Sequence, residues 1–191
     1  MNFKGASLFV YLLIKIDFPI MKFTASLDGL AKGITLGVNL FFLSIAAFPY
    51  LFFQPAERGE EAILIPIFLF LIELGVFIFR PISYTITDQE ITINRLWKSV
   101  IINRKDVQTV EILDKDFFKR TIRTFGVGGM WGYFGKFIHD IAGTMSWYVT
   151  RRDSMILLIL SDDKKVVLSP DDLEGFVNKF EIKPIKSLLE I

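Results

Sequence analysis

The sequence predicts an α+β membrane protein in which a transmembrane helical hairpin is followed by a β-rich domain and a C-terminal helix. Three observations lead to this fold class. Two apolar runs, residues 34–53 and 62–79, lie close together near the N-terminus. Short runs of alternating apolar and polar residues follow Pro81. A helix-start pattern, Ser169-Pro170-Asp171-Asp172, comes directly after the last of these runs.

Each apolar run is long enough to cross a membrane as a helix. Residues 34–53 contain no charged side chain, and residues 62–79 contain one acid, Glu73. A helix rises about 1.5 Å per residue and the hydrocarbon core is about 30 Å thick, so about 20 apolar residues suffice. Lysines and arginines flank the pair, whereas the connecting turn has only Arg58 among three glutamates. The positive-inside rule therefore predicts a multi-pass membrane protein with both termini in the cytoplasm.

These spans divide the chain into a lead-in over residues 1–32, a transmembrane hairpin over 33–80 and a cytoplasmic domain over 81–191. Residues 23–32 mix polar and apolar side chains, which places the lead-in at the membrane interface. Met21 resembles an ordinary start, so residues 1–20 are interpreted as an upstream extension or a mistaken start. A cleaved signal peptide is the alternative, although the region lacks a clear small-residue cleavage site.

The region after Pro81 contains seven runs with the composition and period of β-strands. Asp88-Gln89 separates the first two, which predicts a hairpin. The stretch from 114 to 143 is rich in glycine and aromatic residues and is predicted to be irregular. The predicted strands are residues 83–87, 90–94, 98–102, 107–113, 144–150, 155–160 and 164–168.

A helix is predicted to begin at Ser169 or Pro170, because serine is a good N-cap and proline suits the first helical position. Its apolar residues recur at helical spacing, so that one face packs on the β domain. These residues are Leu173, Phe176, Val177 and Phe180.

Composition excludes several kinds of site. The chain has no cysteine and one histidine, His139, so disulfides, thiolate nucleophiles, cysteine-containing metal sites and multi-histidine metal sites are excluded. The net charge of +1 gives no argument for nucleic acid as a partner. A P-loop requires Ser or Thr after its lysine, and Phe137 follows Lys136. We therefore expect no catalytic residue, no cofactor and no metal.

The glycine- and aromatic-rich stretch is the main candidate for contact with a membrane or a partner. Glycines let the backbone bend, aromatic rings suit the headgroup boundary, and each basic residue contributes about 1 kcal/mol of attraction to anionic lipid. An alternative is that the aromatic residues fold back onto the domain and that the charges are simply solvated. The candidate contact residues are Arg120, Arg123, Trp131, Tyr133, Phe134, Lys136 and Phe137.

A second candidate lies inside the membrane. Asn39 and Glu73 fall at the same depth in an antiparallel hairpin, and an ionisable group in a span needs a partner. Gly33 and Gly37 form a Gly-x-x-x-Gly pair on a different face of the first helix. One face therefore joins the hairpin, and the other suits a second protomer. Plain helix packing with a protonated Glu73 is the alternative.

The order of elements resembles that of bacterial membrane proteins that carry a pleckstrin-homology-like (PH-like) domain. The resemblance covers residues 81–183 and implies a seven-stranded antiparallel PH-like barrel with a C-terminal capping helix. It is carried by residues 84–87, 91–95, 124–129, 147–152 and 168–172.

The resemblance carries over no agreed biochemical activity. The leading hypothesis is a non-enzymatic module, anchored in the inner membrane, that binds a protein, peptide or lipid surface at the cytoplasmic leaflet. A homo-oligomer is a further possible partner state. Phosphoinositide binding does not carry over, because the first hairpin lacks the basic motif that it requires. The rival interpretation is an enzyme of unknown type that uses residues 124–140.

Overall fold

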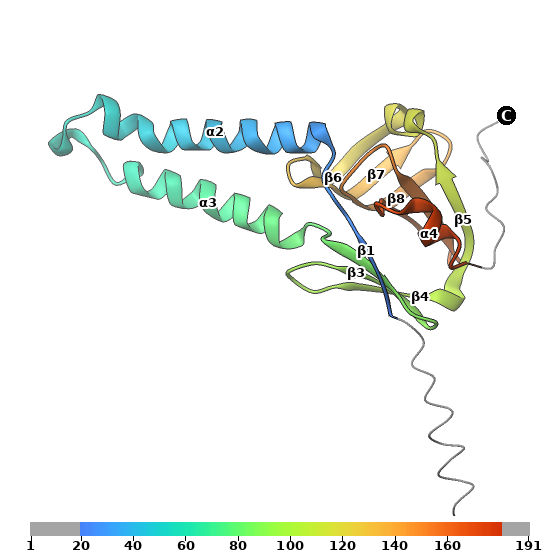
Figure 1. Ribbon diagram of the computed structural model, residues 1–191. Helices are drawn as coiled ribbons and strands as arrows, with labels where there is room; N and C mark the ends of the chain where they lie inside the picture. The colour runs from blue at the N-terminus through green and yellow to red at the C-terminus, as the bar shows by residue number, and fades with distance from the viewer. Residues whose placement is uncertain (1–19, 181–191) are drawn as a thin grey trace, which may run out of the picture.

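The computed structural model describes residues 20–180, and Figure 1 shows two long helices projecting from a β-rich domain. Helix α2 (Gly29–Phe52) and helix α3 (Glu61–Phe79) are joined by a short 3₁₀ helix, η1 (Pro55–Glu57). The interpretations of residues 1–19 as an extension, a mistaken start or a signal peptide lie outside the described residues.

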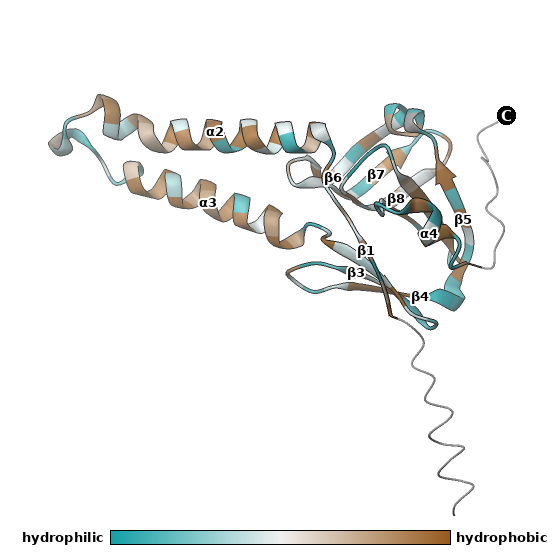
Figure 2. Cartoon of the chain, viewed as in Figure 1, coloured by the Kyte–Doolittle hydropathy of each residue, from teal (hydrophilic) through white to brown (hydrophobic). Residues whose placement is uncertain are grey.

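Both predicted helices are present, and α2 begins five residues before the apolar run at Ile34. Asp28 is the N-cap of α2, and its carboxylate accepts a hydrogen bond from the Ala31 N–H at 2.6 Å. The two helices have 24 and 19 residues and are apolar enough to cross a membrane. Figure 2 shows that apolar residues predominate along both helices. Only 6 % of the most apolar window of each helix is buried within the protein.

The first sheet contains four antiparallel strands in the order β1-β2-β3-β4. They are β1 (Met21–Thr24), β2 (Ser83–Ile86), β3 (Glu90–Asn94) and β4 (Val100–Asn103). Strand β1 was not predicted, since its residues were assigned to the lead-in. It runs antiparallel to β2, with Met21 paired with Ile86 and Thr24 paired with Ser83. Residues just before the first helix thus belong to the same sheet as residues just after the second.

The second sheet contains six strands in the order β5-β9-β10-β8-β7-β6. Its β8 and β10 run parallel, and all its other neighbours are antiparallel. The strands are β5 (Val107–Leu113), β6 (Thr121–Gly129), β7 (Gly132–His139), β8 (Gly143–Val149), β9 (Met155–Leu160) and β10 (Lys165–Leu168).

The prediction of two helices followed by a β-rich domain and a C-terminal helix is confirmed, whereas the seven-stranded antiparallel barrel needs correction. The seven predicted strands are present, but β1 precedes them, and β6 and β7 form a long hairpin within the stretch that was predicted to be irregular. The two sheets are separate, so the barrel is not closed. Short 3₁₀ helices, η2 (Arg104–Asp106) and η3 (Lys115–Arg120), lie on either side of β5.

The six-stranded sheet has a hydrophobic core on each face, as the alternation of side chains along a strand requires. Ile156 and Leu158 of β9 pack with the first sheet and α4 (Leu173–Val177), whereas Leu157 packs on the opposite side with Trp147 and Phe117. The first sheet packs on β5, β9 and β10 but does not extend over the same face of β6 and β7, where Ile122 and Ile138 are exposed.

The C-terminal helix buries Phe176, Val177 and Phe180, as predicted, whereas Leu173 is half-buried. The helix starts later than expected. Asp172 is its N-cap and accepts a hydrogen bond from the Gly175 N–H at 2.8 Å. Ser169 is instead fully buried in the domain, where its hydroxyl accepts a hydrogen bond from the Thr150 N–H at 2.7 Å.

Candidate interaction site at the helix–domain junction

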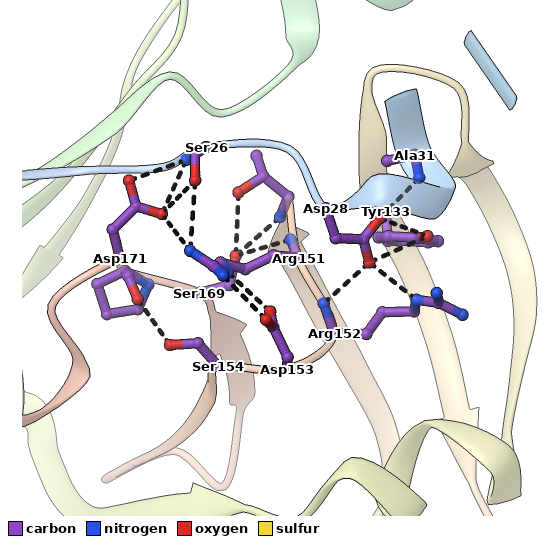
Figure 3. A network of polar contacts seen from close by, with 12 residues as sticks. Ser26, Asp28, Ala31, Tyr133, Arg151, Arg152, Asp153, Ser154, Ser169 and Asp171 are labelled. Carbon is purple, nitrogen blue, oxygen red and sulfur yellow. Dashed lines mark hydrogen bonds and ion pairs between the residues drawn. The ribbon is translucent and has the colours of Figure 1, made fainter. Parts of the chain in front are cut away.

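Asp28 ties the start of α2 to the β domain (Figure 3). Besides capping the helix, its carboxylate accepts hydrogen bonds from the Arg152 guanidinium at 2.9 Å and from the Tyr133 hydroxyl at 3.3 Å. The Arg152 guanidinium also lies over the rings of Phe118 and Tyr133, 5.1 and 5.4 Å from their centroids. Because burial and the negative charge of Asp28 both disfavour a phenolate, the pKa of Tyr133 is raised to about 12.

A second polar cluster in Figure 3 joins the segment before α2 to the segment before α4. Asp171 accepts hydrogen bonds from the Ser26 hydroxyl at 2.7 Å and from Arg151 Nη1 at 3.0 Å. Burial alone would raise the pKa of Asp171, but hydrogen bonds from Ser26, Thr24 and Arg151 lower it to about 2. The approach to α2 is therefore fixed at two places, one on each side of residue 27.

The tip of the β6–β7 hairpin contacts both long helices at their domain-proximal ends. The Trp131 N–H donates a hydrogen bond to Thr35 Oγ1 of α2 at 2.8 Å. The Trp131 ring packs edge-on against Phe77 of α3, with 5.0 Å between the ring centroids. The Arg80 guanidinium lies 4.8 Å from the centroid of the Trp131 ring. Trp131 has a positive φ of 56°, as a tight turn at this position requires.

The other three candidate aromatics lie inside the domain or against it. Tyr133 and Phe137 are buried in the core under η3, and Phe134 is buried on the opposite face of β7. The rings of Tyr133 and Phe137 are therefore enclosed in the core. This arrangement corresponds to the alternative in which the aromatic residues fold back onto the domain. The segment is a β-hairpin and not a loop.

The basic candidates do not form one cluster. Arg120 forms an ion pair with Asp140 at 2.5 Å, and Arg123 is exposed on β6. Lys136 of β7 is also exposed and donates a hydrogen bond from Nζ to the Ser146 hydroxyl at 2.7 Å.

The polar pair inside the helical hairpin is half-buried at both positions. The Asn39 side-chain amide donates a hydrogen bond to the Thr35 carbonyl of its own helix at 2.8 Å. Within residues 20–180, Glu73 has no hydrogen bond to Asn39. The interhelical partnership of these two side chains stays a prediction.

An apolar cleft lies between α3 and the uncovered face of β6, β7 and β8. Its volume is about 660 Å³. The cross-strand register places Val127 beside Phe134 and Phe134 beside Tyr148, so these three side chains share one face of the sheet. Gly75 and Phe79 are among the residues that line the α3 side of the cleft.

Sequence reasoning missed the β3–β4 turn, residues 95–98, which lies beside this cleft. The Trp97 N–H donates a hydrogen bond to the Ile78 carbonyl at the end of α3 at 3.0 Å. The side chains of Leu96 and Trp97 are nevertheless 57 % and 61 % exposed. The signal in the sequence was an apolar pair, Leu96-Trp97, between Arg95 and Lys98, a composition typical of a membrane boundary.

The surroundings of His139 indicate a structural role. Its side chain is buried and stacks on Phe117 with 4.0 Å between the ring centroids. Its Nδ1 accepts hydrogen bonds from the N–H groups of Ile141 and Ala142. Burial lowers its pKa. Among the described residues, no three His, Asp or Glu side chains are grouped so that they would hold a metal ion.

The comparisons with known proteins agree with this architecture. No curated protein and no solved structure matched the chain. The family model described as "Bacterial PH domain" matches residues 82–183, which is more than half of the chain. The matched region begins at the end of α3 and includes both sheets except β1, together with α4. The chain therefore belongs to the bacterial PH domain family.

Proposed function

We propose that this protein is a non-enzymatic, membrane-anchored interaction module that binds a protein, peptide or lipid surface at the cytoplasmic leaflet. Helices α2 and α3 cross the inner membrane, and both termini are cytoplasmic. The observation that carries the proposal is the junction, where Asp28 and Trp131 hold the domain against the same end of both helices.

A domain held in this way presents a fixed surface to its surroundings. Arg80, Pro81 and Ile82 are the only residues between α3 and β2, so the domain has almost no freedom to move away from the helices. The uncovered face of β6 and β7 exposes large apolar side chains, with Ile122 73 % and Ile138 43 % exposed. Such an apolar face is typical of an interaction surface.

Labelling of single cysteines tests the topology, since the native chain contains no cysteine. Glu60 lies in the turn between the helices and Asp162 in the β9–β10 turn, and both are exposed. In intact cells, a membrane-impermeant maleimide should label a cysteine at Glu60 and should label one at Asp162 only after lysis. Labelling of the Asp162 position but not the Glu60 position from outside would overturn the orientation.

Photocrosslinking tests the binding role with the full-length chain in cells. A photoreactive phenylalanine analogue at Ile122 should give discrete adducts with a protein or lipid. The matched control is Gln108, an exposed position on β5 at the other edge of the same sheet. Equal, diffuse labelling at both positions would show that the uncovered face is not an interaction surface.

A further inference from the structure

The cleft beside α3 has the size and the walls of a binding site for an apolar ligand. Its volume of about 660 Å³ lies within the range of about 300–1,000 Å³ that is typical of ligand pockets. Leu71 and Phe79 line it from α3, and Phe125 and Val127 line it from β6. These walls contribute almost only hydrocarbon surface.

The α3 wall of the cleft is partly exposed to the surroundings of the protein. Leu71 and Ile72 are 56 % and 41 % exposed, and both line the cleft. The stretch from Leu71 to Phe79 spans about 12 Å of helix axis, which is most of the hydrocarbon thickness of one leaflet at about 15 Å. The cleft is therefore continuous with the helix surface that a membrane would cover.

Among the residues that the structure describes, two cations and no acid line this cleft. The Arg95 guanidinium lies 5.7 Å from the ring centroids of both Phe79 and Tyr148 and donates hydrogen bonds to the Lys98 carbonyl. Lys136 lines the cleft from β7, and its ammonium donates a hydrogen bond to the Ser146 hydroxyl at 2.7 Å. A ligand that suits this cleft is apolar along most of its length and carries an anionic group at one end.

We propose that the cleft binds an anionic glycerophospholipid from the cytoplasmic leaflet. One acyl chain lies along α3 from Phe79 toward Leu71, and the phosphate lies between Arg95 and Lys136. This assignment rests on the proposed membrane anchoring, which brings the Phe79 end of the cleft to the level of the headgroups and its Leu71 end among the acyl chains. The occupant is a lipid and not a second copy of the chain, because the cleft opens to the lipid-facing side of α3 and carries positive charge alone.

Native mass spectrometry of the full-length, delipidated protein in detergent tests this site. Titration with phosphatidylglycerol should give one preferred adduct. Phosphatidylcholine with the same acyl chains should bind at least about tenfold more weakly, because its headgroup has no net charge. Inorganic phosphate at the same concentration should not displace the phosphatidylglycerol.

Two variants, each with a matched control, connect binding to the cleft. A Cβ at Gly75 would have no atom within 4 Å, so Gly75→Leu places a side chain in open space of the cleft and should abolish the adduct. Gly33→Leu adds the same bulk to α2, also into open space and outside the cleft, and should leave binding unchanged. Lys136→Gln should remove the preference for phosphatidylglycerol, whereas Arg123→Gln should retain it.

Several results would overturn the proposal. These are unchanged binding to Gly75→Leu, equal binding of the two lipids, displacement by inorganic phosphate, and a dimer whose mass excludes lipid. The cysteine labelling and the Ile122 crosslinks are measured on the same variants. If those persist while the phosphatidylglycerol adduct is absent, the lipid site fails and the membrane-anchored module stands.

Discussion

The replacement Phe176→Ala tests whether the short C-terminal helix closes the domain. Phe176 is fully buried and meets three other rings, with centroid distances of 5.1 Å to Phe23, 6.2 Å to Tyr84 and 5.7 Å to Phe180. It therefore joins α4 to β1 and β2. Phe→Ala changes at buried sites cost about 3–5 kcal/mol through lost burial and the cavity left behind. A helix of five residues has almost no stability of its own, so we expect α4 to detach.

The assay is thermal unfolding of the full-length protein in detergent, followed by near-ultraviolet circular dichroism. A loss of about 3–5 kcal/mol corresponds to a fall in Tm on the order of 15 °C for a domain of this size. The control is Glu174→Ala, an exposed position on the same helix, for which we expect a change of less than about 0.5 kcal/mol. If both variants melt at the same temperature, the ring cluster around Phe176 does not stabilise the domain.

Three further predictions concern the junction and the hairpin. Asp28→Ala should lower stability by about 1–3 kcal/mol in thermal melts, and Asp28→Asn by less, because asparagine keeps the helix cap but loses the charge that faces Arg152. Since the pKa of Asp171 falls from 3.8 to about 2 on folding, its contribution is present above about pH 4 and is lost as the pH falls toward 2. Asp171→Asn should flatten that part of a stability-against-pH curve, and an unchanged curve would contradict the assignment. Gly135→Ala should cost on the order of 2–3 kcal/mol, because Gly135 has a φ of 130° and an added Cβ would meet the Phe125 carbonyl; Gly143→Ala, where the space is open, should cost less.

The two long helices were predictable because their signal is local. A run of apolar residues predicts a span wherever the run lies, and both runs are helical. The start of α2 was missed by five residues, since it depends on Asp28. Asp28 caps the helix while Arg152 and Tyr133 hold its carboxylate in place, and those partners lie more than a hundred residues away in the sequence.

The β6–β7 hairpin was not predictable from composition, because glycine normally weakens a strand. Gly126 and Gly135 pair directly across the hairpin, and both have a positive φ. Here glycine permits a strongly twisted close approach of the two strands, which a search for β-branched residues does not detect. Strand β1 was missed for a different reason, since four residues are too few for a periodic pattern and their partner strand begins at Ser83.

The candidate site was predicted only in its outline. Tyr133 and Lys136 were grouped by closeness in sequence, yet the alternation along β7 sends the first into the core and the second to the surface. The cleft combines α3 with the β3–β4 turn and three strands of the other sheet. Arg95 could not be assigned to it without the topology, because its sequence neighbours belong to a different sheet.

Because Asp28 and Trp131 connect the start of α2 to the β domain, the tilt of α2 and the orientation of the domain change together. A helix of 24 residues tilts to fit a thin bilayer and stands more upright in a thick one. The N-cap residue Asp28 forms an ion pair with Arg152, and Thr35 in the second turn accepts a hydrogen bond from the tip of the β6–β7 hairpin. A change in the tilt of α2 would therefore also rotate the sheets. If α2 crosses a membrane as proposed, the thickness of the bilayer would therefore set the angle at which the domain stands to it.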